Sequence, residues 1–126
     1  APLAEELFFR AGLLQLCASR MGRALPACAA SALLFAAGHR AAGAAALLMR
    51  LTAGLALALR FAGSGRNLLE VVLLHGLHNA AAVGGGGAGR SPAEGGGGAG
   101  GGSLEVVPLA FFSAMAVSDA LRLGLL

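Results

Sequence analysis

The feature that most constrains the fold is a succession of long apolar segments, separated by short breaks that contain Arg, Gly or Pro. These segments lie at about residues 3–18, 26–38, 44–61, 71–83 and 104–126. The chain is 57% hydrophobic and 12% charged, and soluble domains carry about twice that charged fraction. Because a soluble domain of 126 residues could not bury so much apolar surface, we expect the chain to fold in a lipid bilayer.

The breaks predict five helices, so we expect an all-α fold, a polytopic transmembrane helical bundle. The predicted helices cover about residues 3–18, 26–40, 44–61, 67–83 and 104–126. Pro26 suits the first turn of the second helix, and Arg50 is expected to interrupt the third. Asn67 is expected to cap the fourth helix, and Glu70 follows three residues later, which is the arrangement of a capping box.

A Gly-rich segment divides the chain. Residues 84–103 contain twelve Gly, and such a sequence cannot offset the entropy lost on ordering, so we expect a flexible loop there. The predicted domains are a motif-bearing membrane core at residues 1–83, this loop, and a C-terminal transmembrane helix at residues 104–126. Several apolar segments are shorter than the roughly 20 residues that span a bilayer. Tilted or broken helices around a polar cavity are therefore expected.

The pattern of charges and cysteines argues against two kinds of site. All nine basic residues are Arg, they are scattered singly without aromatic residues between them, and the net charge is only +3. No nucleic-acid partner is therefore expected. Cys17 and Cys28 have neither metal-ligand spacing nor further cysteines for a disulfide framework. We interpret them as small buried residues.

Three ionisable residues lie at the start of the chain, in the stretch EELFFR at residues 5–10. Glu6 and Arg10 are four residues apart with the acid toward the N-terminus, which favours an ion pair on a helix. Glu5 is turned by about 100° around the helix from Glu6, so it can face a group other than Arg10. The simpler interpretation is a pair of solvated carboxylates that compensate the helix dipole.

The stretch FAAGH places Phe35 one helical turn before His39, at a predicted helix end. A single His in such a place is more often a surface or interface residue than a ligand. The alternating directions of the helices nevertheless bring His39 to the same side of the membrane as the start of the first helix. We therefore retain His39 as a candidate site residue.

The stretch HGLHN, in the middle of an apolar helix, contains three polar side chains. His75 and Asn79 share one face, and His78 is displaced by about 60° from His75. Polar groups are expensive in lipid, and such residues are functional candidates by default. The helix directions place them in the same half of the membrane as the two stretches described above.

In this order, EELFFR, FAAGH and HGLHN match the patterns EExxxR, FxxxH and HxxxN. The sequence resembles the CAAX-protease and bacteriocin-processing (CPBP) intramembrane protease family, which includes the type II CAAX prenyl endopeptidases. The approach to the last motif, LALRFAGSGRNLLEVVLLHGLHN, is also similar, and the resemblance covers about residues 1–83. The Gly-rich loop is not part of the family pattern. The family's transmembrane helices before the EE motif are expected to be missing.

The resemblance implies a membrane-embedded protease, a CAAX prenyl endopeptidase-like hydrolase of peptide bonds. The catalytic residues that it implies are Glu5, Glu6, His39, His75 and Asn79, with structural support from Arg10 and Phe35. Glu5 is then the carboxylate that activates water. Glu6 belongs to the same motif, and it forms the supporting pair with Arg10.

Two mechanisms remain open at this point. In the first, that of a metalloendopeptidase, Glu5, His39 and His75 hold a Zn²⁺ ion with one open position, and the ion activates bound water. In the second, no metal is used: Glu5 and His39 activate water directly, and Asn79 and His75 stabilise the oxyanion. His, Asn and Glu serve both mechanisms, and the HExxH signature of soluble zinc proteases is absent.

The resemblance implies a peptide or protein substrate, prenylated in the case of CAAX tails, and membrane lipid as the surrounding partner. It implies a multi-pass integral membrane protein, and it permits the plastid and the bacterial inner membrane as locations. Two other classes stay open. A non-catalytic scaffold or immunity-type protein of the same fold would use these residues to hold helices together. A fragment of a transporter would use them as an ion path and would continue polar residues across the membrane.

Overall fold

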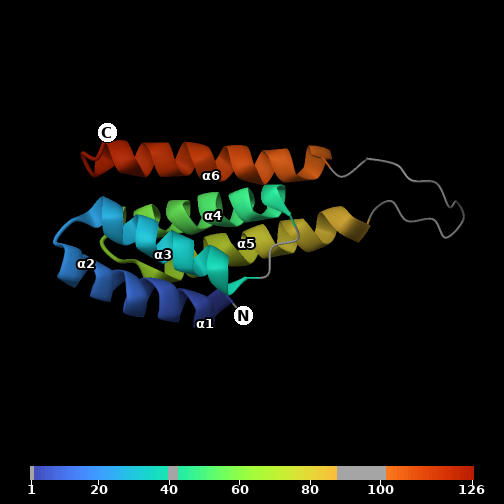
Figure 1. The fold of residues 1–126 in the computed structure, drawn as a ribbon. Coiled ribbons are helices and arrows are strands. Elements are labelled where there is room, and N and C mark those ends of the chain that lie inside the picture. The colour runs from blue at the N-terminus through green and yellow to red at the C-terminus, as the bar shows by residue number, and fades with distance from the viewer. Residues whose placement is uncertain (1, 40–42, 88–101) are drawn as a thin grey trace, which may run out of the picture.

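The computed structural model describes residues 2–39, 43–87 and 102–126, and these residues are helical apart from short turns (Figure 1). Three elements follow one another as a single N-terminal helix: α1 (Pro2–Glu6), the π-helical η1 (Leu7–Leu14) and α2 (Gln15–Met21). The other helices are α3 (Ala24–Gly38), α4 (Ala44–Gly63), α5 (Leu68–Gly87) and α6 (Gly102–Arg122). The described part of the chain thus forms five continuous helices, and the predicted all-α bundle is confirmed.

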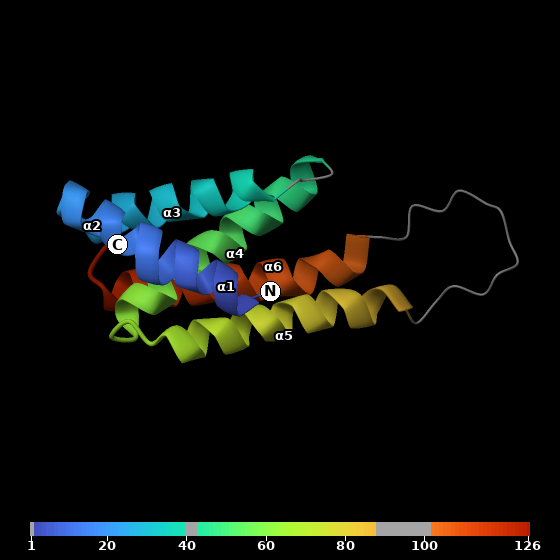
Figure 2. The ribbon, with the colours of Figure 1, turned by 90° about the horizontal axis from the view of Figure 1, so that it is seen from below.

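Successive helices run in opposite directions, so their connections gather at the two ends of the bundle (Figures 1 and 2). The A end holds the turn between α2 and α3, the turn between α4 and α5, and the C-terminus. The B end lies opposite, and α1 begins in the B half of the bundle. α4 is central and packs against both α3 and α6, whereas α1 lies beside α5. This arrangement brings the start of the chain next to the middle of α5.

Small residues let α3 and α4 approach each other closely. The buried Ala side chains of these two helices are Ala27, Ala32, Ala36, Ala53, Ala56 and Ala58. A Cβ atom added at Gly54 would lie 3.1 Å from the Phe35 ring and 3.3 Å from Ala32 Cα. Small residues at helix interfaces are typical of membrane bundles, because they let the backbones come together. The close contact also fixes Phe35, whose ring packs against Arg10 of η1 and His75 of α5.

Two turns at the A end follow signals in the sequence. α2 ends at Gly22, whose φ of 64° lies in the left-handed region that Gly adopts without a steric penalty. α5 begins after Asn67, whose Oδ1 accepts a hydrogen bond from the Glu70 N–H at 3.3 Å, so the predicted helix cap is confirmed. The Glu70 carboxylate is engaged elsewhere than in the expected capping box, because it lies 3.3 Å from Arg60 Nε of α4.

The helix boundaries differ from expectation in two places. Arg50 does not interrupt α4, which continues through it, because Arg is a good helix former and its Nη1 donates to the backbone carbonyl of His39 at 3.2 Å. Helical turns also continue into the expected Gly-rich loop, since α5 extends to Gly87 and α6 begins at Gly102. Gly lowers helix propensity but keeps its backbone hydrogen bonds. Residues 88–101 of that loop lie outside the described residues.

The outer surface of the bundle is apolar. Large exposed side chains on different helices include Phe8, Leu33, Leu73, Phe111 and Leu121. Soluble proteins rarely expose extensive apolar surface, whereas lipid chains solvate it. Within the described part of the chain, α4 is the one helix long and apolar enough to cross a bilayer, with a mean hydropathy of 1.6, and the apolar helices Ala24–Gly38 and Leu68–Ala81 are shorter.

Candidate active site

A buried ion pair lies at the base of the candidate site. Glu6 and Arg10 are both 0% exposed, and Arg10 Nε lies 3.0 Å from Glu6 Oε2, so the ion pair predicted from their spacing is present. The guanidinium also donates from Nη1 to Ser31 Oγ of α3 at 3.3 Å, and its Cζ lies 5.2 Å from the centre of the Phe35 ring. Breaking a buried pair by removing one partner is strongly destabilising. The ion pair therefore holds the Arg10 guanidinium in place, and its hydrogen bond to Ser31 attaches the start of the chain to α3.

Ser31 is a site residue that the sequence analysis missed. Its hydroxyl donates to the backbone carbonyl of Phe9 at 3.1 Å while it accepts from Arg10. Phe9 lies in the π-helical element η1, and single π-helical turns are frequent at functional sites. The signal that could have found Ser31 is its position as the one hydroxyl residue in the apolar stretch at residues 26–38.

His75 is oriented by Glu6. Its Nδ1 lies 2.8 Å from Glu6 Oε1, and both side chains are almost completely buried. A carboxylate only accepts, so Nδ1 carries the proton of this hydrogen bond. The other ring nitrogen, Nε2, then faces Glu5, whose Oε2 lies 3.7 Å away. Glu6 thus fixes both the ring orientation and the nitrogen that His75 presents to Glu5.

His39 is oriented in the same way by the backbone of α3. Its Nδ1 lies 2.7 Å from the carbonyl oxygen of Phe35, which only accepts, so Nδ1 is again the protonated nitrogen. Its Nε2 lies 3.2 Å from Glu5 Oε2. The Phe35 ring packs against the imidazole at 4.5 Å between centres, and Arg50 holds the His39 carbonyl. Arg50 is the second residue that the sequence analysis missed.

Two imidazole nitrogens therefore converge on one carboxylate oxygen. In neutral rings both Nε2 atoms are acceptors, and so is Glu5 Oε2. The separation of 3.2 Å between Glu5 and His39 is a hydrogen-bond distance only if a proton lies between the two atoms. The Glu5 and His39 side chains are 27% and 33% exposed, respectively. The meeting point of these three atoms is accessible from outside.

Asn79 stands apart from this cluster. It lies one turn beyond His75 on α5 and is exposed, and no hydrogen bond among the described residues joins its amide to Glu5, His39 or His75. His78, displaced around the helix as expected, packs its ring against Phe112 of α6 at 4.9 Å between centres. The structure therefore brings together Glu5, Glu6, His39 and His75, together with Arg10 and Phe35, and leaves Asn79 outside.

A structural zinc site needs four donor side chains directed at one point, and a catalytic site needs three. Within the described ranges, no group of three or more His, Cys, Asp or Glu side chains is arranged to hold a metal ion. The residues of the zinc mechanism do converge, with Glu5 Oε2 3.2 Å from His39 Nε2 and 3.7 Å from His75 Nε2. The use of a metal ion at this site stays a prediction.

A family model described as type II CAAX prenyl endopeptidase Rce1-like matches residues 1–81 of the chain. No curated protein and no solved structure matches the chain. The match includes all the residues of the convergent cluster and ends within α5. α6 lies outside it.

Proposed function

Because the chain belongs to the type II CAAX prenyl endopeptidase Rce1-like family, we propose that it is an intramembrane endopeptidase in which Glu5 activates the hydrolytic water. The observation that carries this proposal is the convergence of two imidazole nitrogens on the Glu5 carboxylate, at 3.2 Å from His39 and 3.7 Å from His75. A carboxylate so placed accepts a proton and passes it on. That is the task of a general base.

The proposed reaction begins with a water molecule that inserts between Glu5 Oε2 and His39 Nε2. Glu5 takes a proton from the water while the water oxygen bonds to the carbonyl carbon of the peptide. The carbonyl oxygen becomes an oxyanion. When the intermediate collapses, the C–N bond breaks, and the proton held between Glu5 and His39 moves to the leaving nitrogen. Glu5 is thereby returned to its starting state.

The oxyanion needs donors in an apolar site, where they act most strongly. His75 would donate from Nε2 with a proton on both ring nitrogens, and the Glu6 carboxylate at Nδ1 holds the ring in place. Asn79, one turn further along α5, would supply a second donor if its side chain turned toward the bound peptide. Glu6 and Arg10 support this reaction by holding His75, without contacting the substrate.

We further propose that the chain is a multi-pass membrane protein and that its substrate is a peptide or protein presented at the membrane, with prenylated CAAX tails as the first class to test. The position of Glu5 and His39, both partly exposed, supports a site that such a tail reaches from the B half of the bundle. The plastid and bacterial inner membranes are the proposed locations.

The test is hydrolysis of a prenylated CAAX peptide by the protein reconstituted in vesicles. Glu5→Gln preserves the shape of the side chain and removes proton acceptance, so cleavage should fall by about 10²–10⁴-fold while circular dichroism stays helical. Glu70→Gln is the matched control, because Glu70 lies at the A end and should leave cleavage largely intact. Unchanged cleavage in Glu5→Gln would remove Glu5 from the mechanism. A folded wild type that cleaves no peptide would favour the scaffold alternative.

The same preparation separates the two mechanisms. A metal-free enzyme should contain no stoichiometric metal and should keep its activity in a strong chelator. Reversible loss of activity on chelation, with Zn²⁺ restoring it, would favour the metal mechanism, in which Glu5, His39 and His75 hold the ion. His75→Ala should then abolish metal binding together with activity.

A further inference from the structure

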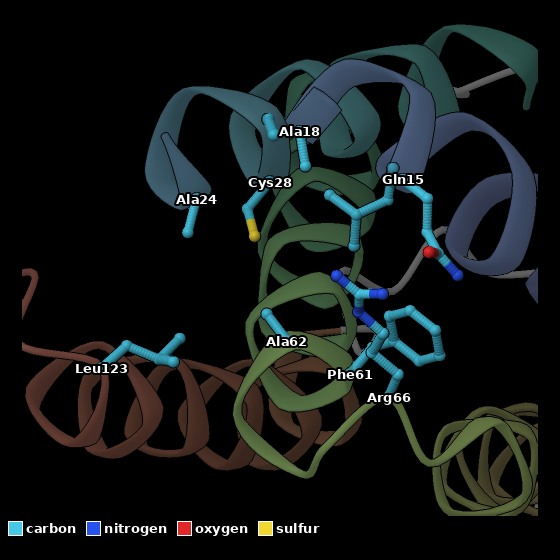
Figure 3. Close-up of a pocket in the computed structure, with 10 residues that line it drawn as sticks. Gln15, Ala18, Ala24, Cys28, Phe61, Ala62, Arg66 and Leu123 are labelled. Carbon is cyan, nitrogen blue, oxygen red and sulfur yellow. The ribbon is translucent and has the colours of Figure 1, made fainter. Parts of the chain in front are cut away.

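A cavity of about 210 Å³ lies at the A end of the bundle, between α2, α3, α4 and α6 (Figure 3). It is separate from the candidate active site, since Gln15 in its wall follows Glu5 by ten residues along the N-terminal helix. Most of its lining is apolar and includes Ala18, Ala24, Phe61, Ala62 and Leu123. Such a cavity favours a hydrocarbon chain over water.

The few polar groups of the cavity gather around one guanidinium. Figure 3 shows the Arg66 side chain extending past Phe61 into the cavity, with Gln15 on one side and Cys28 on the other. Arg66 adopts φ of 66° and is the one non-Gly residue with positive φ in the described part of the chain. L side chains rarely adopt this conformation, and here the Arg66 N–H donates to the Phe61 carbonyl at 2.9 Å. This turn directs a cation over an apolar cavity.

No acid among the described side chains supplies a counter-charge for Arg66. Among the described side chains, the acids of the A end are Glu70 and Asp119, and both pair with Arg60 at 3.3 Å. The other cations at this end are Arg20, Arg23, Arg66 and Arg122, and no ion pair joins any of them to a described acid. The A end therefore carries an excess of positive charge at the mouth of an apolar cavity.

We propose that the cavity binds an anionic phospholipid, with part of an acyl chain among the Ala, Phe61 and Leu123 side chains and the phosphate against the Arg66 guanidinium. Arg66 follows the end of α4 by three residues, which is the depth of the headgroups if α4 crosses the bilayer. Anionic headgroups attract Arg at a membrane surface. The Gln15 amide supplies a second donor for the phosphate oxygens. The proposal does not depend on catalysis at Glu5.

The direct test is native mass spectrometry of the full chain released from micelles that contain equal amounts of phosphatidylglycerol and phosphatidylcholine. The wild type should retain one phosphatidylglycerol in preference to phosphatidylcholine. Arg66→Gln should lower this retention by about fivefold, the effect expected for one surface Arg. Arg23→Gln is the matched control, because Arg23 is an exposed cation of the same end outside the cavity. Equal retention of the two lipids, or equal losses in both variants, would overturn the proposal.

A second measurement reports on the cavity itself. Cys28 is 1% exposed and lines the cavity, so in a Cys17→Ser background its alkylation rate follows access to this space. Phosphatidylglycerol should slow alkylation several-fold, and inorganic phosphate should not. If inorganic phosphate alone slowed alkylation, the ligand of the cavity would be a free anion and not a lipid. If neither slowed it, the cavity would bind neither ligand, and the proposal would be wrong. Arg66→Gly, which relieves the φ of 66°, should remove protection without unfolding the chain.

Discussion

The two ends of this bundle each contain a cluster of charges, and the clusters differ in what their members face. In the B half, Glu6 pairs with Arg10 and also binds His75, so the cluster leaves an imidazole nitrogen directed at the accessible Glu5. At the A end, Arg60 pairs with Glu70 and with the buried Asp119. Each of those charges lies beside a charge of opposite sign.

This difference separates a candidate reactive site from a structural one. A buried charged residue is a candidate for a catalytic role when its partners leave a proton-accepting atom directed at a solvent-accessible position. The A-end cluster instead joins α6 to α4, through Arg60 Nη1 and Asp119 Oδ1 at 3.3 Å. Because the family match ends at residue 81, we interpret this cluster as the attachment of a helix outside the family core.

The largest expected effect is that of Arg10→Met. It leaves the Glu6 carboxylate buried without its cation, so the free energy of unfolding should fall by about 3–5 kcal/mol, and peptide cleavage should be lost with it. Reversible unfolding in mixed micelles measures the first effect. The double variant Glu6→Gln/Arg10→Met removes both charges and should be less destabilised than Arg10→Met. If the double variant is as destabilised as Arg10→Met, the unpaired Glu6 carboxylate is not the cause of the lost stability.

Asp119→Asn should have a smaller effect and a different signature. Polar contacts between membrane helices contribute about 0.6 kcal/mol on average and up to about 1.7, so we expect a loss within that range, with Arg60 still paired to Glu70. Cleavage per folded molecule should not change, because Asp119 lies at the A end. If the cleavage rate falls more than the fraction of folded protein does, Asp119 affects the active site. That result would contradict the separation of a structural A end from a catalytic B half.

Ser31→Ala should cost about 1 kcal/mol, because it removes one hydrogen bond to Arg10 and one to the Phe9 carbonyl. Ser31→Thr retains the hydroxyl and should restore part of the loss, whereas Ser19→Ala, an exposed hydroxyl on α2, should change little. Unfolding midpoints of the three variants rank these contributions. If Ser19→Ala is as destabilised as Ser31→Ala, the hydrogen bonds of Ser31 to Arg10 and to the Phe9 carbonyl do not explain the loss of stability.

Arg50→Gln should have the smallest effect on stability, about 0.5 kcal/mol, because this side chain is partly exposed and holds one carbonyl. Its effect should appear in turnover, since it positions the His39 backbone: we expect kcat to fall a few-fold with KM unchanged. Arg50→Lys, which can still donate, should recover most of kcat. A change confined to KM would indicate that Arg50 contacts the substrate instead.

Local patterns predicted much of the bundle and part of the site. Apolar segments and their Gly and Pro breaks indicated the helices, and spacing alone indicated the pair of Glu6 and Arg10. Ser31 and Arg50 could not be found in this way. Their partners lie 21 and 11 residues away along the chain, and no periodicity connects residues on different helices. Asn79 was assigned to the site from the family motif, and its side chain lies outside the cluster.

The π-helical stretch Leu7–Leu14 also affects how the length of this chain can vary. A π-helical turn accommodates one residue more than an α-helical turn, so the N-terminal helix carries a surplus residue there. Deleting one residue within Ala11–Leu13 should let the helix close as an ordinary α-helix with Glu5 and Gln15 still on their faces. A deletion in α3 would rotate everything beyond it by about 100°. Relatives that differ in length by a single residue should therefore differ in this stretch.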